Sequence, residues 1–369
     1  MTRARLSYGL LTSQDQGGGD KKQGLPPSVG KGHFIFNLIK RKAWPSEKKD
    51  DENTVVGTGL FVAVASSGLN RVMTSPDGII WTPQEASEAN IWRSVTYGTF
   101  NGIGLFVAVA ESGSNRVMTS LDGSNWTSPL TPPPTNQWGS VTYGGTGLFV
   151  AVAFTGLNRV ITSTDGSNWT PQEASEANVW FSVTYGTVNG IGLFVAVAIT
   201  GLNRVMTSTD GSNWTSPLTP PPTNQWLSVT YGTFNGIGLF VAVAETGANR
   251  VMTSLDGSTW TSPLTPPPTN QWSSVTYGTV NGTGLFVAVA GSGLNRVMTS
   301  LDGSTWTSPL TQPPVKGWNS VTYGTVNGIG LFVAVSQEGA VMTSPNGQVW
   351  SLRTASEPNA WKSITYRPY

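Results

Sequence analysis

Short apolar segments alternate with turn-forming residues along most of the chain, and the same segments return at nearly constant spacing. One of them, Trp-x-Ser-Val-Thr-Tyr, occurs seven times, with Ile replacing Val in the last copy, and successive copies lie 42 to 46 residues apart. The copies begin at Trp92, Trp138, Trp180, Trp226, Trp272, Trp318 and Trp361. Self-similarity at a fixed period is the signature of a repeat architecture.

Three further segments recur in each repeat. Gly-Leu-Phe-Val-Ala-Val begins at Gly59, Gly104, Gly147, Gly192, Gly238, Gly284 and Gly330. Val-Met/Ile-Thr-Ser begins at Val72, Val117, Val160, Val205, Val251, Val297 and Val341. A second tryptophan follows at Trp81, Trp126, Trp169, Trp214, Trp260, Trp306 and Trp350. All four segments are short, rich in β-branched and aromatic residues, and bounded by Gly, Pro, Asn or Asp, which predicts strands.

Four short strands in about 45 residues are typical of one blade of a β-propeller. Seven repeats therefore predict an all-β, seven-bladed propeller of four-stranded antiparallel blades. The nearly continuous apolar run at 105–109 fits a strand that neighbouring blades cover on both faces.

The first blade lacks a Trp-x-Ser-Val-Thr-Tyr segment of its own, whereas the chain ends on one. We therefore expect residues 361–366 to pair with the blade begun by residues 59–83 and to close the ring without an open sheet edge. An alternative is the Trp-Pro-Ser of residues 44–46, but charged residues 47–52 replace the rest of that segment.

Two domains follow from this division. Residues 55–369 are predicted to form the propeller, and residues 1–54 a flexible arm in which 10 basic residues outnumber 6 acidic ones. Residues 33–39 could add one strand. Residues 20–27 resemble arms of virion proteins of large algal viruses, which implies other virion or particle proteins as partners through residues 1–54. The alternative is a disordered tail.

The turn before each second tryptophan has the pattern Ser-x-Asp-Gly-x-x-Trp. Its Asp positions are Asp77, Asp122, Asp165, Asp210, Asp256, Asp302 and, with a substitution, Asn346. Physically, Asp caps a tight turn and Gly supplies the positive φ, so a structural turn is predicted. The pattern resembles the Asp-box, or BNR-like, repeat of sialidases and sortilin-type receptors, shortened by one residue, and that resemblance implies a propeller.

Composition excludes several kinds of chemistry. The net charge is +1 and only 11% of residues are charged, so we expect no nucleic-acid partner, and no apolar run is long enough for membrane insertion. Cysteine is absent and His33 is the single histidine, which argues against thiolate, Ser–His–Asp and His-ligated metal sites in the ring. A sialidase site would require a triad of arginines, and arginines that recur at a single position of each repeat do not supply one. We therefore expect no cofactor, no metal and no enzymatic activity.

Six Asn-Arg pairs recur before the third strand, at Arg71, Arg116, Arg159, Arg204, Arg250 and Arg296. Six guanidinium groups in a ring could bind carboxylates, phosphates or sugar hydroxyls. Alternatively, each arginine donates a hydrogen bond to a carbonyl of the neighbouring connector between blades.

Two positions differ in every repeat although their flanks barely change. The position after the first tryptophan holds Arg93, Gly139, Phe181, Leu227, Ser273, Asn319 and Lys362. The position after Phe-Val-Ala-Val-Ala/Ser holds Ser66, Glu111, Phe154, Ile199, Glu245, Gly291 and Gln337. Antiparallel pairing places both on one face of the disk, near the channel. They are either a recognition surface or compensating pairs, such as Arg93 with Glu111.

These observations predict a propeller that presents a multivalent recognition face to a glycan or protein surface, in the manner of a lectin. The alternative is a structural component of a virion or surface appendage, anchored by residues 1–54.

Overall fold

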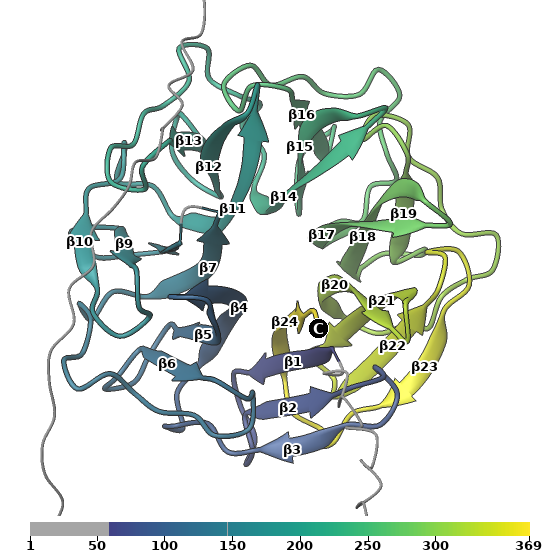
Figure 1. Ribbon diagram of the computed structural model, residues 1–369. Coiled ribbons are helices and arrows are strands. Elements are labelled where there is room, and N and C mark those ends of the chain that lie inside the picture. Colours follow the sequence, from purple (N-terminus) through teal and green to yellow (C-terminus); the bar gives the residue numbers. More distant parts are fainter. Residues whose placement is uncertain (1–58, 146) are drawn as a thin grey trace, which may run out of the picture. The chain divides into compact units, whose positions relative to one another are not determined.

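The structure is a computed structural model that describes residues 59–145 and 147–369. Every regular element in these ranges is a strand, and the strands form seven antiparallel sheets. Figure 1 shows the sheets as blades around a common axis, which confirms the predicted seven-bladed propeller. No helix in the described ranges could span a bilayer. The boundary between residues 54 and 55, the arm and the alternative segment 44–46 lie outside the described residues and stay predictions.

We number the blades 1 to 7 in the order in which their second strands occur along the chain. The innermost strands, from blade 1 to blade 7, are β24 (Trp361–Arg367), β4 (Trp92–Phe100), β7 (Trp138–Gly144), β11 (Trp180–Val188), β14 (Trp226–Phe234), β17 (Gln271–Val280) and β20 (Trp318–Val326). The second strands are β1 (Leu60–Ala65), β5 (Ile103–Ala110), β8 (Leu148–Ala153), β12 (Ile191–Ala198), β15 (Ile237–Ala244), β18 (Thr283–Ser292) and β21 (Ile329–Ser336). The third strands are β2 (Val72–Ser75), β6 (Val117–Ser120), β9 (Val160–Ser163), β13 (Val205–Ser208), β16 (Val251–Ser254), β19 (Val297–Ser300) and β22 (Ala340–Ser344).

The predicted fourth strand forms in only three of the described blades, as β3 (Thr82–Gln84), β10 (Thr170–Gln172) and β23 (Ser351–Thr354). In blades 2, 4, 5 and 6 a single bridge replaces it, such as the one between Thr119 and Thr127. These four blades carry the Thr-Ser-Pro-Leu-Thr connector, in which Pro129 and its equivalents follow the bridge. Proline has no N–H to continue the ladder, and the chain bends directly after it.

The hydrophobic core lies between blades rather than within them. In blade 2, Phe106 and Ala108 of β5 pack with Trp92 against Val62 and Val64 of the preceding blade, all fully buried. The second strands are therefore covered on both faces, which explains their nearly continuous apolar sequence.

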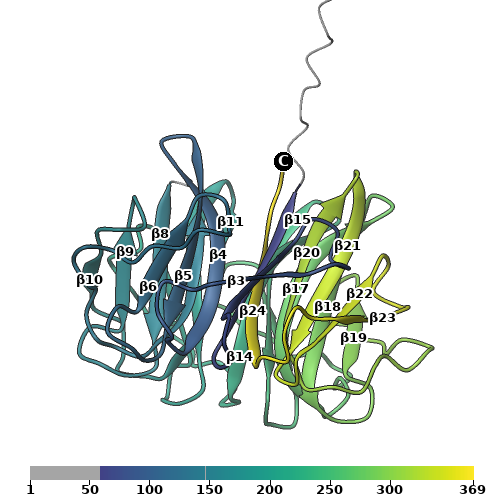
Figure 2. The same cartoon turned by 90° about the horizontal axis from the view of Figure 1, so that it is seen from below.

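The C-terminal strand completes blade 1. β24 pairs antiparallel with β1 along the whole length of β1. It also bonds to both adjacent blades, because Ser363 Oγ accepts the Val95 N–H at 3.2 Å and the Ile364 N–H donates to Ser320 Oγ at 3.3 Å. The predicted pairing of the C-terminal strand with the first blade is confirmed, and Figure 1 shows β24 beside β1 on the inner side of the ring, with β24 seen from the side in Figure 2.

The same serine contact recurs between all seven pairs of adjacent blades. The innermost strand of each blade has one unpaired edge, and the serine of the preceding blade accepts one of its N–H groups there. In the remaining pairs the donors are Val141, Val183, Val229, Val275 and Val321, with Oγ atoms 3.1 to 3.2 Å away. The Ser-Val of the repeat thus links the blades around the ring.

Candidate functional site

The variable position after the innermost tryptophan is a β-bulge in every blade. In blade 2 the pairing passes from Trp92–Ala110 to Ser94–Val109, which leaves Arg93 without a partner on β5. The same register shift occurs at Gly139, Phe181, Leu227, Ser273, Asn319 and Lys362. A bulge removes one residue from the strand's alternation and re-aims its side chain. Substitution at this position therefore leaves the ladder on either side unchanged.

The seven bulge residues line one cavity of about 120 Å³ together with Phe154, and we call this the channel-mouth pocket. The structure therefore brings together residues that lie 42 to 46 positions apart in the sequence. Of the second variable set, Phe154 alone lines the cavity, while Glu111 contacts Arg93 from outside it and Glu245 does not line it. Ligand binding by these residues stays a prediction.

One wall of the pocket is a stack of planar side chains from three blades. Arg93 forms an ion pair with Glu111, and its guanidinium carbon lies 5.7 Å from the ring centroid of Phe154. The Phe154 ring in turn stacks on Phe181, with centroids 5.0 Å apart and planes at 29°. A Cβ on Gly139 would lie only 2.2 Å from the Phe154 ring, so Phe154 occupies the space of the missing side chain.

The other residues that line the pocket are Leu227, Ser273, Asn319 and Lys362. Asn319 Nδ2 donates to the carbonyl of Trp361 in the adjacent blade at 2.8 Å, which fixes its amide. Burial lowers the pKa of Lys362, the positive charge of Arg93 lowers it further, and Glu111 partly opposes both. The pocket therefore has cationic and apolar parts in close proximity.

Both sequence interpretations of the variable positions have support in the structure. Arg93 and Glu111 are a compensating pair within one blade. Phe181 and Asn319, however, make contacts across to neighbouring blades. The packing of Phe154 over Gly139 was not predicted from the sequence. The signal was present, because this repeat has the smallest residue at the first variable position and a large residue at the second.

The repeated arginines make the backbone contacts that the second sequence alternative requires. Arg116 Nη1 donates to the carbonyls of Thr135 and Asn136 at 2.7 and 2.8 Å, and Nε to Gly113 at 3.2 Å. Similar bonds to a connector carbonyl come from Arg71, Arg159, Arg204 and Arg250. A ligand-binding role for the six arginines stays a prediction.

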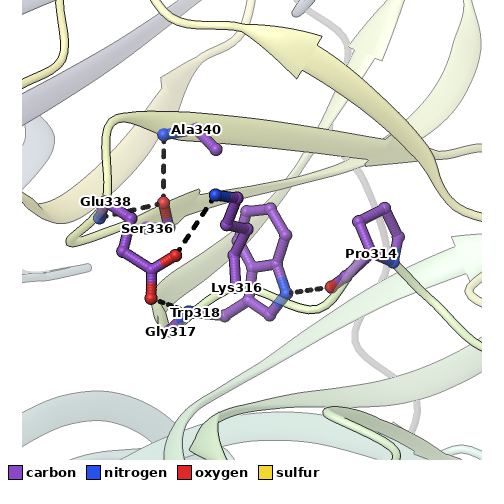
Figure 3. A network of polar contacts seen from close by, with 7 residues as sticks. All are labelled: Pro314, Lys316, Gly317, Trp318, Ser336, Glu338 and Ala340. Atoms are coloured by element: carbon purple, nitrogen blue, oxygen red, sulfur yellow. Dashed lines mark hydrogen bonds and ion pairs between the residues drawn. The ribbon is translucent and has the colours of Figure 1, made fainter.

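Where a connector differs in sequence, an ion pair takes over the contact. Asn136 and its equivalents donate to a carbonyl of the next blade's loop, but the connector that enters blade 7 has Lys316 at that position. Lys316 Nζ lies 3.4 Å from Glu338 Oε2, and Glu338 Oε1 also accepts the Gly317 N–H at 3.2 Å. Figure 3 shows both contacts. An ion pair thus joins the loop to the connector where an asparagine hydrogen bond does so elsewhere. This replacement indicates that the fold requires a contact between the two.

We expect Arg116→Met to lower the free energy of unfolding by about 1–3 kcal/mol, because hydrogen bonds from a charged donor to connector carbonyls are lost. Arg296→Met is the matched control, since the hydrogen bond recorded for Arg296 joins it to Gly293 within its own loop. Urea unfolding of both variants measures the difference. Equal losses would contradict the assignment of Arg116 to the connector.

The predicted Asp turn is built as a closed set of hydrogen bonds. In blade 3, Asp165 Oδ1 accepts the N–H groups of Ser167 and Asn168 at 2.8 and 2.7 Å and the Ser163 hydroxyl at 3.0 Å. Trp169 Nε1 donates to the carbonyl of Gly166 at 2.9 Å. Asn346 makes the equivalent turn through its Oδ1. The Oδ1 atoms of these side chains therefore accept hydrogen bonds from groups of their own turns.

These turns predict a loss of stability in acid. Burial alone would raise the pKa of Asp165, but hydrogen bonds from Asn168, Ser167 and Ser163 outweigh it and lower the pKa from 3.8 to about 2. The pKa of each of the five other turn aspartates is lowered as well. Because the folded pKa lies below the unfolded one, the stabilisation is complete above pH 3.8 and is lost as the pH falls towards about 2.

Asp165→Asn tests this. Asparagine already forms the turn in blade 7, so the variant should fold, be less stable than the natural chain at pH 7, and approach it in stability near pH 2. Melting temperatures at a series of pH values measure the difference. Parallel curves would contradict the titration of Asp165 as a source of stability.

Larger cavities lie beside the turns. One of about 570 Å³ is lined by Leu285, Asp302 and Gln348, and smaller equivalents lie at Asp122 and Asp256. Their Asp carboxylates accept hydrogen bonds from their own turns. Within the described residues no group of three His, Cys, Asp or Glu side chains is placed to hold a metal ion. His33 lies outside those residues.

No protein-family model and no curated protein matches the sequence. Among solved structures, the chain resembles virginiamycin B lyase from Staphylococcus aureus at 13% identity and a TM-score of 0.57, over 72% of this chain and 85% of the lyase. A streptogramin B lyase matches at 12% identity and 0.57, over 79% and 93%. BBS1N in complex with ARL6DN matches at 9% identity and 0.52, over 72% and 81%. These likenesses support the propeller fold.

The prediction that the chain is not an enzyme is wrong in the light of these comparisons. The similar structures include a lyase, and a catalytically inactive variant of virginiamycin B lyase has been solved with quinupristin at 12% identity to this chain. The prediction excluded particular triads and metal sites, but a fold hosts many chemistries, so their absence from the ring does not exclude activity. At such low identity the comparison assigns no catalytic role to any residue here.

Proposed function

We propose that this propeller is a binding module that holds a segment of a partner protein at the channel-mouth pocket. The observation that carries the proposal is the concentration of sequence differences. The bulge position is one of two positions that differ in every one of the seven nearly identical repeats, and all seven bulge residues line the same cavity. If the bulge position served packing alone, the same residue could occupy it in all seven repeats.

Two further features support a protein segment as the ligand. The pocket combines an aromatic stack, a leucine and two cations, and such a mixture of apolar walls and a few polar groups is typical of binding sites. BBS1N, whose fold is similar, was solved in complex with ARL6DN. Several blades contribute side chains to the pocket, so one ligand would contact several repeats at once.

The other functions suggested by the sequence stay predictions. A lectin-like multivalent site would use the six arginines, whose Nη1 and Nε atoms are largely engaged with backbone carbonyls. Kinship with Asp-box proteins rests on the turn motif. A structural role in a virion or appendage rests on residues 1–54, which lie outside the described residues.

A peptide-display selection against the whole chain tests the proposal. We expect selected peptides to bind the triple variant Arg93→Ser, Phe181→Ser, Leu227→Ser about tenfold or more weakly, a loss of about 1.4 kcal/mol or more. Serine already occupies the same bulge at position 273, so the backbone should tolerate it.

The matched control carries Leu130→Ser, Leu218→Ser and Leu264→Ser. These leucines are fully exposed on the connectors between blades, so their replacement should leave affinity unchanged. Fluorescence polarisation gives the affinities, and circular dichroism checks that each variant is folded. Peptides that bind the pocket variant and the natural chain equally would refute the proposed function.

A further inference from the structure

The charges at the channel-mouth pocket do not balance. Lys362 and Arg93 are lining residues, and Glu111 contacts the pocket through Arg93. The ion pairs recorded among the described residues are Arg93–Glu111 and Lys316–Glu338, so Lys362 has no carboxylate within 4.0 Å. These three groups together therefore carry one excess positive charge.

The side chain of Lys362 is half-buried in this position. Burial and the neighbouring Arg93 guanidinium lower its pKa, because both disfavour the charged ammonium. A second anion beside the ammonium would remove that cost, and Glu111 is already committed to Arg93. Within the described residues, no acidic side chain lines the pocket, and Lys362 has no carboxylate of its own there.

Apolar side chains surround this charge. Phe154 is buried and stacks on Phe181 at 5.0 Å, and Leu227 lies beside them in the same cavity. A volume of about 120 Å³ admits a few non-hydrogen atoms and no folded surface. A fully hydrated multivalent anion would leave this apolar wall without contacts.

We propose that the channel-mouth pocket binds a single carboxylate joined to a short apolar group, as in the free C terminus of a partner protein that ends in an aliphatic residue. This inference rests on the proposed function and specifies its ligand. The carboxylate lies against the Lys362 ammonium and neutralises the excess charge. The aliphatic side chain packs on Phe181 and Leu227. The rest of the partner extends away from the channel.

N-acetylleucine and its amide are the probes, because they differ only in the carboxylate. Titrated into the whole chain and followed by NMR, the acid should bind about tenfold more tightly than the amide, as expected for a charge-assisted contact of about 1.4 kcal/mol. Lys362→Met should abolish that preference and Lys362→Arg should keep it. Lys316→Met is the control, since this lysine lies outside the pocket and should leave the preference unchanged.

Equal binding of acid and amide to the natural chain would overturn the inference, as would an unchanged preference in a folded Lys362→Met variant. The two proposals can fail separately. If selected peptides depend on the pocket but bind equally with a free or an amidated C terminus, the proposed function stands and the carboxylate assignment falls. If no peptide depends on the pocket but the preference for N-acetylleucine is found, the pocket takes a small free carboxylate and the protein-binding function falls.

Discussion

Removal of residues 361–369 is expected to abolish cooperative folding of the propeller. These residues include all of β24, which pairs with β1 and supplies the fully buried Trp361 and the interblade contacts of Ser363 and Ile364. Without them, β1 has an unpaired edge and the apolar faces of blades 2 and 7 lose their cover. An exposed apolar edge favours association with other chains. Thermal unfolding and size-exclusion chromatography should show a broad transition and aggregates.

Deletion of residues 368 and 369 alone is the control, because this leaves β24 intact and removes little more than the contact of Tyr369 with Asn327. A synthetic peptide of residues 359–369 added to the long truncation should restore a sharp transition. A truncated chain that unfolds as cooperatively as the natural one would show that β24 is not required for closure.

Trp226→Ala is expected to lower the free energy of unfolding by about 3–5 kcal/mol, the range for aromatic-to-alanine changes in a core. Trp226 is fully buried, packs against Val195, Val197 and Val205 of the preceding blade, and donates Nε1 to the Pro222 carbonyl at 2.9 Å. The substitution therefore leaves a cavity between two blades and releases the connector. Chemical denaturation measures the loss.

Trp260→Ala is the matched comparison within the same blade. Its indole is only half-buried and donates to Gly257 in its own turn. The expected loss is smaller because less apolar surface was removed from water in the folded chain. If the two variants lost equal stability, the innermost tryptophan would have no special role in joining blades.

Sequence reasoning was strongest where seven copies of a pattern could be compared. The strands that begin at Trp92 and Leu105 and their equivalents were predicted because β-branched and aromatic runs between turns are strongly strand-forming. It was weaker at the fourth strand, where the tryptophan at 126 predicted a strand but the following Pro129 reduced it to a bridge. Whether the hydrogen-bonded ladder continues therefore depends on the residues that follow the tryptophan, and not on the tryptophan itself.

The candidate site was predicted in part. Variation at Arg93 and its six equivalents singled out the residues that line the channel-mouth pocket. Their shared bulge was not predicted, because alternation in the sequence does not record an unpaired residue within a strand. Phe154 was placed with the other variable residues, but nothing in the sequence showed that it crosses over Gly139 to stack on Phe181.

The sequence by itself determined the number of blades, the order of their strands and the completion of blade 1 by the C-terminal strand. Those features follow from local strand propensity and from the count of repeated segments, and both are readable along the chain. Only the tertiary structure decided which side chains meet at the axis and which charge remains unpaired there. Residues from seven blades become neighbours only when the ring forms, so their contacts depend on closure and not on any one repeat.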